Sequence, residues 1–377
     1  MLTPNGRGSF AAQAAELLGT VTSVLRGHHD SMAVTSQTVF LRDASQQRQC
    51  EKILEEYYGA EFPVTNYVLQ PPCCGAALAL EAWALGGPSV RVERFGPQTM
   101  AVSYDGVRWV YCAGIKPLIQ NGGTYERASD LFKQLNTALV QAGSGLEQVV
   151  RTWFYVGGIT DPEADGQRYF EFNRARSHAY QGLHFYRSLL EPGTNQPVFP
   201  VSTGIGMNGG GMMAGCAALQ TRRPDARLIQ LENPQQTPAY AYHPRYSAES
   251  PKFSRGLALV LGKYVTTWIS GTASIVNSES RYPGDIRRQT EQTIENIERL
   301  ITTENFALHG LGSVKAGLHD LAKIRVYLKR PEDFCACKAI CERRFGSVPA
   351  IYAVADVCRP ELLVEIEGVA FSKSSGA

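Results

Sequence analysis

The sequence predicts an α+β protein in which mixed β-sheets carry helices on one face. Strand-like and helix-like segments alternate along the chain, the same order of segments occurs twice, and a further region precedes both copies. Each copy contains two or three strands, a helix, a strand, a helix and two closing strands. Amphipathic helices and sheets bury their apolar faces against each other, so this order favours helices packed on one side of each sheet. We place the parts at residues 1–95, 96–225 and 226–377.

The first copy begins with the strand-like run VRWVYCAG, which a helix follows. Leucines at the spacing of one helical face predict this helix: Leu131, Leu135 and Leu139. The β-rich run LEQVVRTWFYV comes next at 146–156, and YFEFNRARSHAY at 169–180 predicts a second helix. The strands PVSTGIG and MMAGCAALQ then close the copy.

The second copy repeats this order from YVTTWISG onward. Its first helix places Ile286, Ile294 and Ile297 on one face, and LHDLAKIRVYL then matches LEQVVRTWFYV position for position. A helix that Pro331 opens and Gly346 closes follows, before the strands VPAIYAVADV and ELLVEIEGVAF. In front of both copies, FAAQAAELLGTVTSVL at 10–25 also has helical spacing.

Composition excludes several classes of function. The net charge of +2 predicts no nucleic-acid partner, and no run of apolar residues is long enough to cross a membrane. The N-terminus lacks the pattern of an export signal, so we expect a cytoplasmic protein with reduced cysteines. The densest cysteine group has no CxxC pair and no nearby histidine, so we expect no metal. The glycine-rich GIGMNGGGMM joins two strands and opens no helix, so we expect no cofactor either.

Several motifs resemble a known family. The order SGTASI, KIRVYL, VPAIYAV and VEIEGVA resembles the YjgF-like, or Rid, fold. More specific runs resemble the chorismatases, which carry a YjgF-like C-terminal half: NYVLQPPCCGAALALEAWAL, PVSTGIG, ENPQQTPAYAYHPRYSAESPKFSRG and SGTASIVNSESRYPGD. The resemblance covers most of the chain after the first 60 residues. It implies an enzyme that splits chorismate into pyruvate and a small ring carboxylic acid.

Two acids in the last strand are the candidate catalytic pair. Glu365 and Glu367 point to the same face of LLVEIEGVAF, because side chains alternate along a strand. Burial and a like-charged neighbour would raise the pKa of one of them and keep a proton available near neutral pH. An exposed edge strand is the alternative. Aligning the repeat places Ala214 opposite Glu365, and the resemblance implies that Glu365 is the proton donor.

The resemblance also bears on the product. In the chorismatases that form 3-hydroxybenzoate, a cysteine precedes the catalytic glutamate by seven residues and a glycine occupies the SGTAS turn. Chorismatases that hydrolyse chorismate to a dihydroxycyclohexadiene carboxylate have alanines at both places. Cys358 and Gly271 match the first type, and Ala273 lies in the same turn. We therefore expect 3-hydroxybenzoate, alone or mixed with 4-hydroxybenzoate.

Chorismate carries two carboxylates, which require fixed cations and hydrogen-bond donors. The candidate substrate-binding residues, besides Gly271 and Ala273, are Arg151, Thr203, Tyr240, Tyr246 and Arg255. The chain has YSAESP where the family pattern reads YGPRSP, so it lacks the Arg-Pro of that loop. We expect Arg174 and Arg176 on an exposed helix face.

Two other functions compete with this assignment. The imine-hydrolysing Rid enzymes use an arginine about fifteen residues before the glutamate, where this chain has Ala350 or Ile351. Without that arginine, the carboxylate of an imino acid has no bidentate partner. A YjgF-like protein that binds a ligand without turnover is the second alternative. Because free YjgF-like proteins form trimers with sites between subunits, fused copies could supply those neighbours within one chain, and we expect a monomer.

Overall fold

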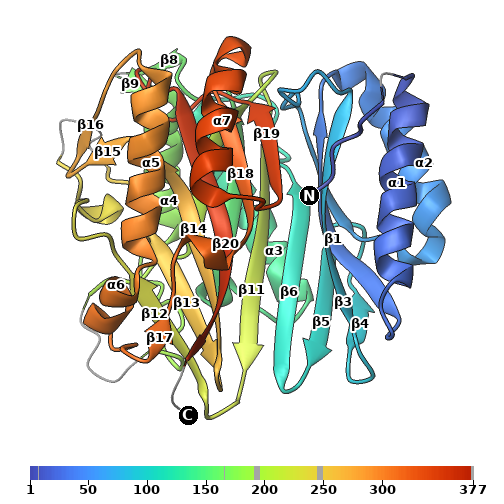
Figure 1. Ribbon diagram of the computed structural model, residues 1–377, viewed down its shortest axis with the longest axis horizontal. Helices are drawn as coiled ribbons and strands as arrows, with labels where there is room; N and C mark the ends of the chain where they lie inside the picture. The colour runs from blue at the N-terminus through green and yellow to red at the C-terminus, as the bar shows by residue number, and fades with distance from the viewer. Residues whose placement is uncertain (7, 165, 191–195, 244–248, 375–377) are drawn as a thin grey trace.

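The computed structural model describes residues 1–6, 8–164, 166–190, 196–243 and 249–374, and its strands lie inside a shell of helices (Figure 1). Helices α1 (Phe10–Arg26) and α2 (Gln47–Tyr58) cover the N-terminal sheet, and α5 (Ile286–Leu300) and α7 (Phe334–Phe345) lie on the side that faces the viewer. The predicted α+β class is confirmed. Within the described ranges, no helix is both long and apolar enough to span a bilayer.

The first large sheet has the strand order β10-β7-β11-β6-β5-β4. Its elements are β4 (Arg91–Arg94), β5 (Thr99–Tyr104), β6 (Val107–Ile115), α3 (Thr124–Gln141), β7 (Val149–Gly157), α4 (Arg168–Ala179), β10 (Val201–Met207) and β11 (Met212–Thr221). The three predicted leucines of α3 are fully buried, and each contributes roughly 1.5–3 kcal/mol. A short hairpin precedes α4: β8 (Pro162–Glu163) and β9 (Gly166–Gln167).

The second large sheet repeats this topology in the order β19-β18-β20-β14-β13-β12, with β17 beside β20. Its elements are β12 (Ala226–Leu231), β13 (Gly256–Leu261), β14 (Tyr264–Ala273), β15 (Ile275–Val276), β16 (Glu279–Ser280), α5 (Ile286–Leu300), α6 (Thr303–Leu308), β17 (Val314–Lys315), β18 (Leu321–Leu328), α7 (Phe334–Phe345), β19 (Ala350–Val354) and β20 (Val364–Ser374). In both sheets the two outermost strands at one end are parallel and the other pairs are antiparallel. The predicted internal repeat is confirmed, and the boundaries at 95 and 225 stay predictions.

The N-terminal region is a third, shorter copy that the sequence analysis did not recognise. After α1 come β1 (Met32–Leu41), α2, β2 (Val64–Val68) and β3 (Leu78–Gly86). Strand β1 is parallel to β2 and antiparallel to β3, as β18 is to β19 and β20. The glycines that end α2 and α7 share one left-handed conformation, with φ of 53° at Gly59 and 67° at Gly346. The copy lacks the first three strands of the other units.

Short 3-10 turns connect several of these elements. They are η1 (Ala44–Gln46), η2 (Gly59–Glu61), η3 (Leu146–Gln148), η4 (Ala239–Ala241), η5 (Leu318–Asp320) and η6 (Pro331–Asp333). Turns η1 and η6 stand at the same place in their units, directly before α2 and α7.

Strand registers show which residues correspond among the three units. Glu365 pairs with Tyr327 of β18, Met213 pairs with Tyr155 of β7, and Ala79 pairs with Phe40 of β1. Tyr327, Tyr155 and Phe40 lie in one central core, so Met213 and Ala79 occupy the place of Glu365. The predicted alignment of Ala214 with Glu365 is therefore wrong by one residue. By the same registers, Glu81 and Gly215 correspond to Glu367.

A buried group of charges, the central ion cluster, joins the three units. It consists of Glu81, Arg151, Lys323, Arg325 and Glu367. The Glu81 carboxylate lies 2.6 Å from both Lys323 Nζ and Arg325 Nε, and Glu367 lies 2.7 Å from Arg151 Nη2. Although burial opposes ionisation, Arg325 and Lys323 hold the pKa of Glu81 well below its usual range.

Replacing Glu81 with alanine should destabilise the protein strongly. The substitution leaves Lys323 and Arg325 buried with too little negative charge, and removing one partner of a buried ion pair costs about 3–5 kcal/mol. Denaturant unfolding of Glu81→Ala measures this loss. The matched control is Glu56→Ala, because Glu56 pairs with Lys52 on the surface and its loss should cost less than about 1 kcal/mol. Equal losses in the two variants would contradict the role of the cluster.

Candidate active site

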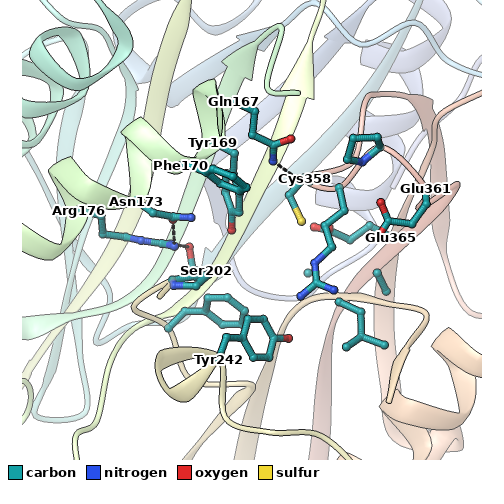
Figure 2. Close-up of a pocket in the computed structure, with 18 of the residues that line it drawn as sticks. Gln167, Tyr169, Phe170, Asn173, Arg176, Ser202, Tyr242, Cys358, Glu361 and Glu365 are labelled. Carbon is teal, nitrogen blue, oxygen red and sulfur yellow. Dashed lines mark hydrogen bonds between the residues drawn. The ribbon is translucent and has the colours of Figure 1, made fainter. Parts of the chain in front are cut away.

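A cavity of about 200 Å³ lies between the first and second large sheets. The first unit supplies α4, β9 and β10 to its wall, and the second unit supplies β14, β20 and the segment between β19 and β20. Glu365 and Cys358 lie on one side, and Arg176 and Asn173 lie on the opposite side (Figure 2). The pocket is therefore made by two units of one chain.

Glu365 is buried, with 4% of its surface exposed, and its strand β20 runs between β14 and β18. The alternative of an exposed edge strand is therefore wrong. The carboxyl group faces the pocket and makes no hydrogen bond with any residue that the structure describes. Burial, followed by the negative charge of Glu367, raises the pKa of Glu365 to about 8. Near neutral pH this carboxyl holds a proton.

Glu367 behaves in the opposite way, although it lies on the same strand face. Its carboxylate accepts hydrogen bonds from Thr203 Oγ1, from Arg151 Nη2 at 2.7 Å and from Trp153 Nε1 at 2.8 Å. Burial disfavours the charged form, but Arg151, Arg325 and Lys323 together hold the pKa of Glu367 below its usual range. The pair therefore combines one fixed carboxylate with one neutral acid, as the sequence predicted for two acids on one face.

Cys358 and Gly271 both lie against Glu365. The Gln167 side chain donates to the Cys358 carbonyl at 2.7 Å and holds this segment against the first unit. Burial, with a contribution from Glu365, raises the pKa of the Cys358 thiol to about 12, so the thiol is neutral. At Gly271, a Cβ atom would stand 2.0 Å from Glu365 Oε1. Only glycine leaves room for the carboxyl group in this position.

The prediction of an exposed Arg176 is wrong. Arg176 is 1% exposed, lines the pocket, and donates to Asn173 Oδ1 at 2.5 Å and weakly to Ser202 Oγ at 3.4 Å. Arg174 does lie at the surface, where it pairs with Glu171. Among the described residues Arg176 has no carboxylate partner, and its Nε atom and Asn173 Nδ2 have no hydrogen-bond partner. A buried cation of this kind requires an anion.

Arg255 is a second buried cation in the same pocket, and the sequence analysis did identify it. Its Nη2 atom donates to Tyr242 Oη at 2.5 Å and to the Thr237 carbonyl at 3.1 Å. Within the described ranges, no carboxylate forms an ion pair with Arg255, and its Nε atom lacks a hydrogen-bond partner. The pocket therefore offers two guanidinium groups that form no ion pair with a carboxylate of the described ranges.

The structure brings five predicted site residues to the pocket wall: Gly271, Ala273, Arg255, Cys358 and Glu365. Arg151 and Thr203 lie behind Glu367 instead, in contact with its carboxylate, and do not line the pocket. Tyr240 packs its ring on Phe199. Tyr246 lies outside the described residues.

Several wall residues were not identified from the sequence. They are Gln167, Tyr169, Phe170, Asn173, Arg176, Ser202, Tyr242, Phe253, Arg359 and Glu361. The available signal was the spacing of Asn173 and Arg176, which places an amide and a guanidinium on one helical face. Tyr242 stands two residues after the predicted Tyr240, beyond the 3-10 turn that changes the direction of the chain.

A protonated carboxyl facing two unneutralised guanidinium groups is suited to acid-catalysed chemistry on a small dianion. Comparison with known proteins is consistent with this class. Residues 81–217 match the family described as "Chorismatase FkbO/Hyg5-like, N-terminal". A 3-hydroxybenzoate synthase of Streptomyces hygroscopicus is 34% identical over 295 residues, which are 77% of this chain and 80% of the relative.

Two further proteins are similar over much of their length. A chorismatase of Streptomyces rapamycinicus is 33% identical over 301 residues, with 77% of this chain and 81% of the relative covered. A crystal structure of a chorismatase has a TM-score of 0.68 and 22% identity, and the match covers 98% of this chain and 97% of that one. The chain belongs to the chorismatase family, and the resemblance noted in its motifs is confirmed.

Replacing Glu365 with glutamine should stabilise the protein at alkaline pH. The folded protein raises the pKa of Glu365 from 4.5 to about 8. The contribution of this group to the free energy of unfolding is therefore most favourable at pH values below 4.5, where the carboxyl is neutral in both the folded and the unfolded protein. Its contribution falls as the unfolded chain ionises and is lost as the pH rises through about 8. Glutamine stays neutral, so Glu365→Gln should melt about 2–5 °C above the parent protein near pH 9 and with little difference near pH 4.5.

Thermal melts at both pH values measure this effect. The control is Glu342→Gln, since Glu342 is largely exposed and, in the part of the chain that the structure describes, forms an ion pair only with Lys338 one helical turn away. A Glu365→Gln protein that shows the same melting difference at both pH values would contradict a raised pKa for this carboxyl.

Proposed function

We propose that this member of the chorismatase family cleaves the enolpyruvyl ether of chorismate to give pyruvate and 3-hydroxybenzoate. The observation that carries the proposal is the neutral, buried carboxyl of Glu365 in a pocket with two unneutralised arginines. The similarity to the 3-hydroxybenzoate synthase of Streptomyces hygroscopicus supports the choice of product. Cys358 and Gly271, which lie against the acid, match the same type.

Glu365 acts as the general acid. Its proton goes to the methylene carbon of the enol ether, which creates an oxocarbenium ion that a ring hydroxyl can capture. The attacking hydroxyl gives up its proton, and the bond between the captured carbon and the original ether oxygen breaks, so that this oxygen takes up a proton and stays on the ring as a hydroxyl. The bond between the ring and the attacking oxygen then breaks, which releases pyruvate with that oxygen as its ketone, and the ring carbon loses its hydrogen as a proton to become aromatic. The two products contain all the atoms of chorismate, so that ring proton restores the acid and no water is consumed. Burial, together with the fixed charge of Glu367, keeps Glu365 protonated between turnovers by raising its pKa.

Arg176 and Arg255 bind the two carboxylates of the substrate. Each guanidinium is held by neutral partners and keeps its charge for an anion, among the residues that the structure describes. Arg151, a candidate for this role from the sequence, instead forms an ion pair with Glu367 on the side away from the pocket, so we assign it to positioning that carboxylate. Cys358, as a neutral thiol beside Glu365, directs the ring intermediate by donating a hydrogen bond.

We also propose that the protein acts as a cytoplasmic monomer. Both walls of the pocket come from one chain, so a second copy is not required to complete it. The non-catalytic alternative leaves unexplained why an acid that opposes folding at high pH is kept at the centre of the pocket.

The assay that tests the proposal follows pyruvate by a coupled reaction and identifies the ring product by chromatography and mass spectrometry. We expect pyruvate and 3-hydroxybenzoate in equal amounts. Glu365→Ala should lower kcat by about 10²- to 10⁴-fold, as for loss of a general acid. In the parent protein kcat should fall as the pH rises through about 8, because Glu365 loses its proton there.

Two results would count against this assignment. Pyruvate that is absent altogether would return the protein to the ligand-binding alternative. A dihydroxycyclohexadiene carboxylate as the main product would make the enzyme a hydrolase. Cys358→Ala should move the parent product mixture toward that diene, while Glu342→Gln should leave rate and product unchanged, since Glu342 is largely exposed.

Neighbouring arginines of α4 provide a matched test of substrate binding. Arg176→Met should lower kcat/KM by roughly 10- to 150-fold, the effect of losing a hydrogen bond to a charged group. Arg174→Met, two residues earlier on the exposed side, should change kcat/KM less than about twofold. Steady-state kinetics on both variants measures the difference, and equal effects would refute a role for Arg176 in holding the substrate.

A further inference from the structure

A second cavity of about 280 Å³ lies away from the pocket of Glu365, where strands of all three units meet. The chain has four tryptophans, and all of them line this cavity: Trp83, Trp109, Trp153 and Trp268. They come from β3, β6, β7 and β14, so no single sheet accounts for the grouping. Protein interiors are close-packed, and a space of this size with such walls is unusual.

The remaining wall is largely apolar. It includes Leu85, Leu259, Leu261, Val369 and Phe371. Trp109 packs at 5.6 Å from Trp268 and is stacked at 6.3 Å on Tyr111, measured between ring centroids. Phe371 is 51% exposed and marks where the cavity reaches the surface. Flat rings on several sides suit a flat ring compound.

The charged side chains at the cavity wall do not favour the binding of a charged ligand. Glu81 and Arg325 reach the wall, but they are paired with each other at 2.6 Å. Cations of the protein already lie over two of the indole rings: Lys323 is 4.8 Å from Trp83 and Arg151 is 4.7 Å from Trp153. An anion would therefore find no free cation among the described residues of the wall, and a second cation would be repelled.

The polar groups that remain are neutral. The indole N–H groups of Trp83 and Trp153 donate to Glu81 and Glu367, and that of Trp109 donates to Tyr104. Among the described residues, the indole N–H of Trp268 and the hydroxyl of Tyr111 have no hydrogen-bond partner. Each of these groups can form a hydrogen bond with a neutral molecule.

We propose that this cavity is a second ligand site, which binds a neutral aromatic molecule of one or two rings. The size agrees with the class of ligand, because an apolar protein cavity of about 150 Å³ holds benzene. The site differs in chemistry from the pocket of Glu365, where unneutralised arginines select anions. It does not depend on the reaction proposed for that pocket.

Isothermal titration calorimetry with the full chain tests the site. Benzyl alcohol is the probe, and benzoate and benzylammonium are its charged counterparts of the same shape. We expect one benzyl alcohol to bind with a Kd below about 1 mM, and tryptophan fluorescence to change over the same range. Benzylammonium should bind at least tenfold more weakly, and any binding of benzoate should disappear in Arg176→Met.

A variant that fills the cavity separates this site from other binding. Thr266 lines the cavity at the position where the first unit has Trp109, so Thr266→Trp introduces a ring that the repeat already accommodates. Benzyl alcohol binding should fall at least tenfold in Thr266→Trp and stay unchanged in Tyr264→Trp, since Tyr264 is exposed and lies outside the lining. Ala217→Phe is a second filling variant from the opposite sheet.

Three outcomes would overturn the proposal. One is no heat and no fluorescence change with benzyl alcohol. Another is binding that survives in the folded filling variants. The third is binding that disappears in Arg176→Met, which would place the ligand in the pocket of Glu365.

Discussion

Charges buried where three sheets meet have to be matched within the protein, and the fold depends on this requirement. Glu81 of the N-terminal unit faces Lys323 and Arg325 of the second unit, and Glu367 of the second unit faces Arg151 of the first. No unit can move away without leaving a charge unpaired in a medium that solvates it poorly. The same ion pairs fix Glu367 as a carboxylate, and its charge contributes to keeping Glu365 neutral two residues before it.

The arginines of the protein also divide into two groups with different roles. Arginines that hold the structure together, Arg151 and Arg325, have carboxylate partners. The guanidinium groups of the pocket arginines, Arg176 and Arg255, donate hydrogen bonds to neutral groups and form no ion pair with a carboxylate among the described residues. This difference, rather than burial alone, distinguishes cations that stabilise the fold from cations that are available to a dianionic substrate.

Much of this arrangement could be predicted from the sequence. Alternation along one strand was enough to place Glu365 and Glu367 on one face, and the repeated order of segments was enough to predict both large sheets. Contacts between distant segments could not be predicted. Arg151 and Glu367 are 216 positions apart in the chain, and the sequence around either residue contains no pattern that indicates their pairing.

The other errors also have physical reasons. The apolar residues of α4 do not form a clean stripe, so the buried side of that helix, with Arg176, could not be read from periodicity. Bulges at Ala214–Cys216 and Ile269–Thr272 obscure the register of the repeat by one residue. The third unit could not be recognised from the order of segments because it lacks three strands. Its Cys50 and Gly59 nevertheless follow Phe40 at the same spacing as Cys337 and Gly346 follow Tyr327.

The covalent linkage of three related units has a consequence for how the protein can change over generations. In a symmetric trimer of identical subunits, a single codon change alters every interface at once, so each junction must tolerate it. Here a codon change alters only one junction. The places that correspond to Glu365 hold methionine in the first unit and alanine in the N-terminal unit. One junction can therefore retain an acid that lowers the stability of the fold, while selection for stability places apolar residues at the other two.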